Sequence, residues 1–285
     1  MQTWTIKALL DWISPYLHEK EVDAARLCTE LLMCHVLGKQ RMELYTQFDA
    51  IVPPAQLAQL RALVKHAGDH EPVAYLVGKT EFYSMELAVR PGCLIPRPET
   101  EMLVQHGIEF LRKREGQQSV LDLCTGSGCV AAAIAHNFKN ADITATDLSQ
   151  NALDIAAENI AKHQLTERIT LCQGDLLTPV SSGPFDLIVS NPPYVSEAEY
   201  EALNRNVKDY EPREALLAGP KGLDIYERLV SQIQPHLKPN AAVMLEIGYL
   251  QGPDLHSLLE KTGLFSHVQI HKDLQKLDRL AVGIR

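Results

Sequence analysis

The sequence predicts an α/β fold, with an open sheet in its larger part and a small helical domain ahead of it. An apolar strand, residues 120–123, runs into a glycine-rich turn and then a helix of small residues. Two further strands, residues 142–147 and 169–175, end in acids, and a fourth apolar run, residues 185–190, ends at Asn191. In open α/β sheets, ligands bind at the carboxyl ends of the strands, so we expect a binding site there.

Residues 1–72 are expected to form the helical domain, because apolar residues recur there at helical spacing. Pro53-Pro54 is expected to open the third helix. Simple core packing explains these stripes, and the bundle can also serve as a lobe that recognises a substrate protein. The expected inward residues are Ile6, Leu9, Leu10, Ile13, Tyr16 and Leu17, then Ala25, Cys28, Leu31, Leu32 and His35, then Leu57, Leu60 and Val64.

The rest of the chain is expected to contain a connector and the large domain. Residues 73–100 mix β-branched and aromatic runs with glycine and proline, which predicts a hairpin and connector. Residues 101–285 are expected to form the large domain, with later strands near 241–247, 267–271 and 280–285. Residues 196–225 are polar and rich in loop formers, a composition typical of a lid.

The glycine turn alone does not decide which nucleotide cofactor binds there. Gly126-x-Gly128-x-x-Ala131 satisfies the dinucleotide pattern, and Asp147 follows Gly126 by 21 residues, near the spacing of a ribose-binding acid. A nicotinamide dehydrogenase is therefore one alternative. Asp122 inside the first strand argues against it, because dinucleotide binders usually carry an apolar residue there. A nucleophilic Ser127 is disfavoured, because no G-x-S-x-G elbow surrounds it.

The tetrapeptide Asn191-Pro192-Pro193-Tyr194 points to chemistry at a nitrogen. Proline pushes the preceding residue towards an extended conformation, which keeps Asn191 out of any helix. The Asn191 side-chain oxygen and the Pro192 carbonyl can each accept a hydrogen from a planar –NH2 group, and Tyr194 can cover a flat substrate. This predicts modification of an amide or exocyclic amine nitrogen; a plain Asn-Pro turn is the alternative.

Taken together, these motifs resemble a known enzyme class. Asp122, the acids after the second and third strands and the Asn-Pro-Pro-Tyr after the fourth occur in the order of class I S-adenosylmethionine-dependent methyltransferases. Further motifs narrow the resemblance to the HemK/PrmC family, the glutamine-N5 methyltransferases of peptide chain release factors. They are residues 71–82, 92–101, 211–216, 222–224, 246–252 and 278–279.

The resemblance implies a Rossmann-like class I methyltransferase fold with a mostly parallel seven-stranded sheet and a small N-terminal helical bundle. It implies methyl transfer from S-adenosylmethionine to the glutamine of the Gly-Gly-Gln loop of release factors, leaving S-adenosylhomocysteine. Expected catalytic residues are Asn191, Pro192 and Tyr194, with Pro193 also contacting substrate. Expected cofactor-binding residues are Cys124, Thr125, Gly126, Ser127, Gly128, Asp147, Asp175, Leu176 and Asn191.

Three alternatives stay open beside this expectation. The sister enzymes of the family methylate a glutamine of a large-subunit ribosomal protein. DNA adenine-N6 methyltransferases share the Asn-Pro-Pro-Tyr logic, but they flip a base and contact phosphates. The third alternative is a binding module that kept the pocket as a scaffold. Two departures from the family are Cys124, where many methyltransferases carry glycine, and Leu176, where some relatives carry an aromatic residue.

The composition limits the classes of binding partner that we expect for this protein. The net charge of −9 argues against a large nucleic-acid groove. There is no apolar run of 18 or more residues and no signal-peptide layout at the start, so we expect a cytoplasmic protein without membrane contact. The six cysteines form no C-x-x-C pair and are expected to be reduced thiols. His66 and His70 lack a third ligand, so no metal is expected. We expect a monomer.

Overall fold

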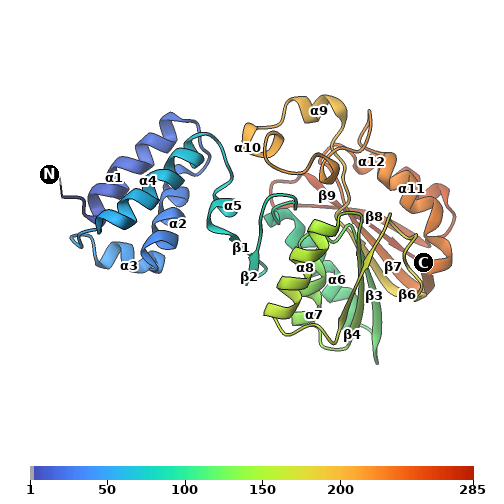
Figure 1. The fold of residues 1–285 in the computed structure, drawn as a ribbon. Helices are drawn as coiled ribbons and strands as arrows, with labels where there is room; N and C mark the ends of the chain where they lie inside the picture. Colours follow the sequence, from blue (N-terminus) through green and yellow to red (C-terminus); the bar gives the residue numbers. More distant parts are fainter. Residues whose placement is uncertain (1–2) are drawn as a thin grey trace. The chain divides into compact units, whose positions relative to one another are not determined.

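The computed structural model describes residues 3–285, which divide into two compact units (Figure 1). The first unit comprises the chain up to Lys79 together with Asn204–Tyr210. The second comprises Thr80–Leu203 and Glu211–Arg285. The change of unit after Lys79 falls inside the segment that the sequence predicts as connector. Within residues 3–285, no helix has both the length and the apolar character needed to cross a bilayer.

The first unit is helical. Thr5 caps the first helix, because its hydroxyl accepts a hydrogen bond of 3.2 Å from the amide of Ala8. The Tyr210 hydroxyl donates to the carbonyl of Asp69 at 2.9 Å, which ties the returning segment 204–210 to the bundle. The helices are α1 (Ile6–Glu19), α2 (Ala25–Leu37), α3 (Arg41–Thr46), α4 (Pro54–Gly68), α5 (Val73–Val77) and α10 (Arg205–Lys208).

The buried face of α2 differs from the predicted one. Leu31 is 37% exposed and His35 is exposed, so the predicted stripe was wrong at these residues. Glu30 is buried and forms ion pairs with Arg26 and with Arg41 of α3. A buried carboxylate needs such partners, and periodicity cannot foresee them. The buried residues of the helix are Ala25, Thr29, Glu30, Leu32, Met33 and Val36.

The predicted hairpin starts later than residue 73. Residues 73–77 form the short helix α5, which ends at Gly78 with a φ of 76°. The strands β1 (Lys79–Phe82) and β2 (Met85–Ala88) follow and make a two-stranded sheet. Tyr83 and Ser84 between them both have positive φ, the conformation of a tight hairpin turn.

The second unit contains the predicted mostly parallel seven-stranded sheet. Its strand order is β5-β4-β3-β6-β7-β9-β8, with β9 antiparallel to both of its neighbours. The chain steps outward from β3 to β5 and returns to β6 beside β3, so the order reverses between β3 and β6. The strands are β3 (Gln118–Leu123), β4 (Ala141–Asp147), β5 (Ile169–Gln173), β6 (Phe185–Ser190), β7 (Leu237–Glu246), β8 (His267–Lys272) and β9 (Asp278–Ile284).

Helices cover both faces of this sheet (Figure 1). Helices α6 (Glu101–Arg112), α7 (Cys129–Asn137) and α8 (Gln150–Lys162) pack one apolar core against one face. Helices α11 (Asp224–Gln232) and α12 (Gly252–Lys261) pack a second core against the other face. Two buried faces explain the continuous apolar runs of β3 and β6. Shorter elements are η1 (Pro98–Thr100), α9 (Glu197–Glu201), η2 (Arg213–Ala215) and η3 (Gln234–His236).

Candidate active site

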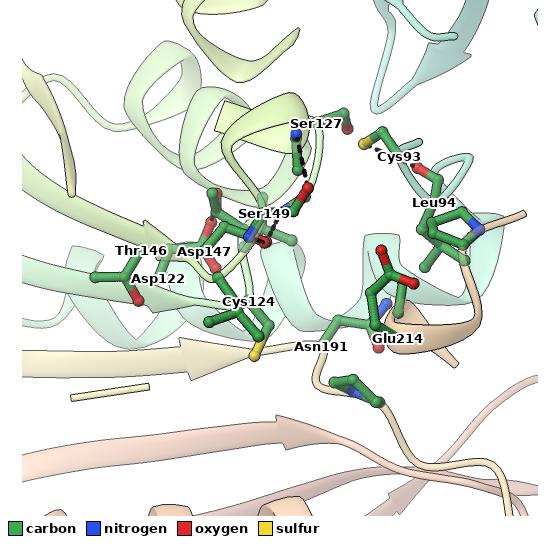
Figure 2. A pocket seen from close by; sticks show the side chains of 18 of the residues that line it. Cys93, Leu94, Asp122, Cys124, Ser127, Thr146, Asp147, Ser149, Asn191 and Glu214 are labelled. Carbon is green, nitrogen blue, oxygen red and sulfur yellow. Dashed lines mark hydrogen bonds between the residues drawn. The ribbon is translucent and has the colours of Figure 1, made fainter. Parts of the chain in front are cut away.

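A cavity of about 380 Å³ lies at the carboxyl ends of β3, β4 and β6, where the strand order reverses. Ligands bind at this point of open α/β sheets. Figure 2 shows Asp122 and Asp147 on one side of the cavity and Asn191 and Glu214 on the other. The loops after four strands line it, together with residues of segments 92–100 and 212–215 and of α11.

The glycine turn after β3 adopts a strained path that suits a close ligand. Cys124, Gly126 and Gly128 have φ values of 57°, 56° and 76°. A Cβ atom on Gly128 would lie 3.1 Å from the Cβ of Ala156 on α8, so glycine there lets α7 pack closely on α8. Thr125, Gly126 and Ser127 line the cavity, whereas Gly128 does not.

Asp122 anchors this turn from beneath. It is buried, and its Oδ2 accepts hydrogen bonds from Thr125 Oγ1 at 2.6 Å and from the amide of Ala131 at 3.1 Å. Burial raises the pKa of the carboxyl to about 7, against the effect of these two hydrogen bonds. One side chain therefore ties the end of β3 to the first turn of α7, a role that its position inside a strand did not reveal.

Asp147 joins two loops at the cavity wall. Its Oδ2 accepts from the amide of Gly126 at 2.8 Å, and its Oδ1 accepts from the amide of Ser149 at 2.9 Å. Burial raises its pKa, and these backbone hydrogen bonds act in the opposite direction. Each carboxylate oxygen can accept a second hydrogen bond, so Asp147 keeps acceptor capacity for the hydroxyls of a ligand.

Asp175 and Leu176, just after β5, also line the cavity. Asp175 forms an ion pair with Arg228 of α11, which lines the same cavity. Leu176 is buried and has a φ of 49°, and its carbonyl accepts a hydrogen bond of 3.3 Å from Thr146. Leu176 thus supplies an apolar surface at a position that the family resemblance implies for cofactor binding.

The amide of Asn191 is held in one orientation. Its Nδ2 donates to Thr100 Oγ1 at 3.1 Å, and the side chain lines the cavity. Within residues 3–285, neither Asn191 Oδ1 nor the carbonyl of Pro192 accepts a hydrogen bond. Pro193 lines the cavity as well, whereas Pro192 and Tyr194 do not belong to its lining. The tetrapeptide therefore offers two acceptors that have no partner in the described chain.

Tyr194 is anchored by motifs that the sequence singled out without assigning them a role. Its hydroxyl donates to Glu246 Oε1 at 3.4 Å, and burial raises the pKa of this phenol. Gln251 Nε2 donates to the carbonyl of Tyr194 at 3.0 Å and to that of Gly222 at 3.1 Å. A Cβ atom on Gly222 would lie 2.2 Å from the Tyr194 carbonyl oxygen. These contacts fix the position of Tyr194 at the end of the tetrapeptide.

Pro96 and Thr100 of the connector line the cavity, and other residues of this region bind neighbouring segments. Arg97 forms an ion pair with the buried Glu211, whose Oε2 also accepts from the amide of Ile95 at 3.1 Å. Glu101 accepts from the amide of Tyr83 at 2.8 Å and so holds the hairpin turn. The sequence places Arg97, Thr100 and Glu101 together at the edge of the pocket; of the three, only Thr100 lines the cavity. Arg228 carried no sequence signal, because nothing in α11 marks it before the fold brings it to the cavity.

Acidic side chains dominate the charge of the cavity. Asp122, Asp147, Asp175 and Glu214 line it, and Arg228 neutralises Asp175. Over residues 3–285, no group of three or more histidine, cysteine, aspartate or glutamate side chains is arranged to hold a metal ion. His66 instead pairs with Glu71 at 2.7 Å.

Two family models match the chain. The PrmC N-terminal domain matches residues 8–78, and the methyltransferase small domain matches residues 99–209. A release factor glutamine methyltransferase of Rhodopirellula baltica is 39% identical over 281 residues, covering 97% of this chain and 95% of the relative. The enzyme of that name from Geobacter sulfurreducens is 39% identical and covers 99% of this chain and 97% of the relative.

The chain belongs to the release factor glutamine methyltransferase family. Its fold agrees: a crystal structure of a methyltransferase from Pyrococcus furiosus aligns with a TM-score of 0.51 at 20% identity, over 80% of this chain and 97% of that one. In the present chain, the cavity brings together all the residues predicted to bind cofactor except Gly128. The family resemblance stated from the sequence is confirmed.

Proposed function

We propose that the protein transfers a methyl group from S-adenosylmethionine to the side-chain nitrogen of a glutamine, in the Gly-Gly-Gln motif of peptide chain release factors. The observation that carries this proposal is the Asn191 amide, whose nitrogen is engaged by Thr100 and whose oxygen is left to accept. Together with the free Pro192 carbonyl, it matches the two N–H groups of a primary amide. The names of the relatives support glutamine as the acceptor and release factors as the substrate.

The cavity fits S-adenosylmethionine better than a nicotinamide dinucleotide. Its acidic lining suits a ligand that carries positive charge and disfavours the anionic pyrophosphate of NAD. Ser127 Oγ is buried in the lining and makes no hydrogen bond within residues 3–285, so a donor is available for the ligand. Asp147 has acceptor capacity for ribose hydroxyls, and Leu176 provides an apolar wall.

The proposed mechanism depends on how the residues of the site would orient the substrate amide. When bound, S-adenosylmethionine supplies an electrophilic methyl group on a positively charged sulfur. An amide nitrogen is a weak nucleophile, because its lone pair is delocalised into the carbonyl. Asn191 Oδ1 and the Pro192 carbonyl would each accept one N–H of the glutamine amide and fix the direction of its nitrogen, a contribution of orientation. As acceptors they would also stabilise positive charge that develops on the nitrogen before it loses a proton.

Substrate recognition is the role we propose for the first unit, since every residue that lines the cavity belongs to the second. The net charge of −9 supports a protein rather than a nucleic-acid substrate. A substrate that acts in translation termination places the reaction in the cytoplasm.

Calorimetry tests the cofactor assignment. Titration of the protein with S-adenosylmethionine is expected to give saturable binding, and titration with NAD is expected to give none. The Asp147→Asn variant should bind S-adenosylmethionine more weakly, because an amide replaces one of two acceptors that face backbone N–H groups. Binding of NAD alone would overturn the proposal.

A further inference from the structure

The orientation of the Asn191 amide depends on more than its contact with Thr100. A threonine hydroxyl can both donate and accept, so by itself it would tolerate either face of the amide. In the flipped orientation, Asn191 would accept from Thr100 and present its –NH2 to the cavity. A second group must therefore decide which role the Thr100 hydroxyl plays.

Glu246 is that second group. It ends β7 and is 2% exposed, and the register of β6 with β7 pairs Ser190 with Leu245, which brings Glu246 beside Asn191. The Thr100 hydroxyl is near enough to the Glu246 carboxyl to lower the pKa of that carboxyl. Oε2 of this carboxyl is buried and accepts no hydrogen bond within residues 3–285, so it is an unused acceptor. An ionised carboxylate only accepts, so it would take the single hydroxyl hydrogen of Thr100.

Once Thr100 donates to Glu246, its oxygen can only accept from Asn191. The observed 3.1 Å contact from Asn191 Nδ2 to Thr100 Oγ1 has this direction. Thr100 is 1% exposed, so water cannot easily substitute for either partner. The Tyr194 hydroxyl, 3.4 Å from Glu246 Oε1, occupies the other oxygen of the carboxyl.

We propose that Thr100 and Glu246 are positioning residues that fix the Asn191 amide with Oδ1 toward the cavity. The inference rests on the proposed glutamine methylation and deepens it, because it explains why the acceptor rather than the donor end of Asn191 meets the substrate. Neither residue is required to touch the glutamine.

Two substitutions of Thr100 separate positioning from packing. Thr100→Val keeps the branched shape and removes the hydroxyl, whereas Thr100→Ser keeps the hydroxyl and removes a methyl group. If Thr100 acts by packing, the serine variant is the more damaged of the two. If it acts by positioning, the valine variant is. Glu246→Gln is a third variant of nearly equal shape, whose amide can either donate to or accept from Thr100.

The experiment measures kcat, and KM for a purified release factor, with labelled S-adenosylmethionine at pH 8. Thermal unfolding and calorimetric cofactor affinity report whether each variant is folded. We expect Thr100→Val to lower kcat roughly 10- to 100-fold with little change in cofactor affinity, and Thr100→Ser to recover most of that loss. Glu246→Gln should lower kcat in the same direction.

The outcomes separate this inference from the proposed function. Label on the release factor with the wild-type protein, together with unchanged kcat in folded Thr100→Val or Glu246→Gln, overturns the positioning role alone. A serine variant slower than the valine variant also overturns it. Absence of label with the wild-type protein overturns the proposed function, and this inference falls with it. Should Thr100→Val fail to fold, the kcat of Glu246→Gln decides.

Discussion

At the scale of single residues, we expect methyl transfer to depend on Asn191. Its side-chain oxygen and the carbonyl of Pro192 are the acceptors that would hold a substrate amide. Asn191→Ala removes one of them, and we expect turnover to fall by roughly 100-fold while cofactor affinity changes far less, since the lost contact is made to substrate. Steady-state methylation and calorimetry measure the two quantities.

Asn151→Ala is the matched control for this variant. Asn151 is exposed on α8 and does not line the cavity, so its removal should leave turnover unchanged. Near-normal turnover in Asn191→Ala would contradict the role given to the tetrapeptide.

Glu246 gives a prediction about pH. Burial raises the pKa of its carboxyl to about 7, with Glu99 raising it further and the Thr100 hydroxyl and Arg279 lowering it. The folded protein therefore binds this proton more tightly than the unfolded chain does. The associated stability is present at low pH and is lost as pH rises from about 4 to 7. Glu246→Gln removes this dependence.

The test compares urea unfolding of wild type and Glu246→Gln at pH 5 and pH 8. The unfolding free energy of the variant relative to wild type should rise between these pH values, by on the order of a few kcal/mol. Asp122 titrates in the same range but is present in both proteins, so its effect cancels. A relative stability that is independent of pH would refute this account of Glu246.

Some residues of the site could be predicted from the sequence, and others could not. Asp147, Asp175 and Asn191 were predicted from strand-end positions, and all three line the cavity, because parallel strands bring their carboxyl ends together. Arg228 reaches the site only through the packing of α11, which spacing along the chain does not encode. The catalytic roles given to Pro192 and Tyr194 stay predictions.

At the scale of elements, the loop at Gly222 is the sharpest constraint. Gly222 has a φ of 71°, and a Cβ atom there would lie 2.2 Å from the Tyr194 carbonyl oxygen. Gly222→Ala should therefore lower stability by more than about 2 kcal/mol and reduce turnover, because the loop and Tyr194 cannot both keep their places. Chemical denaturation and a methylation assay measure these effects.

Gly116→Ala is the control for backbone strain. Gly116 has a φ of 76°, but nothing lies within 4 Å of the position its Cβ would take. Its substitution should cost only about 1 kcal/mol, the strain of a left-handed conformation. Equal losses in the two variants would show that the contact with Tyr194 is unimportant.

Other elements show where sequence patterns fail. Apolar runs buried on both faces marked β3 and β6 clearly. The short helix α5 was expected as part of a hairpin region, because Val73, Tyr75 and Val77 favour strands on their own. In α2, Glu30 is buried, although it is charged, because Arg41 of α3 forms an ion pair with it. In each case tertiary contacts override local preference.

At the scale of the whole molecule, the two units predict separable functions. All residues that line the cavity lie in the second unit, so deletion of residues 1–70 should leave cofactor affinity nearly unchanged. Methylation of an intact release factor should fall much more, because we assign its recognition to the first unit. Calorimetry and a methylation assay on the truncated protein give both values. Loss of cofactor binding, or full activity on the intact factor, would contradict this division of roles.

The most direct test of the central claim identifies the modified residue. The protein is incubated with labelled S-adenosylmethionine and purified release factors, beside a parallel reaction with purified ribosomal proteins, and the products are mapped by mass. We expect one methyl group on the glutamine of the Gly-Gly-Gln motif and no label on ribosomal proteins. Label confined to a ribosomal protein would contradict the substrate assignment, although the chemistry of the Asn191 site would still stand.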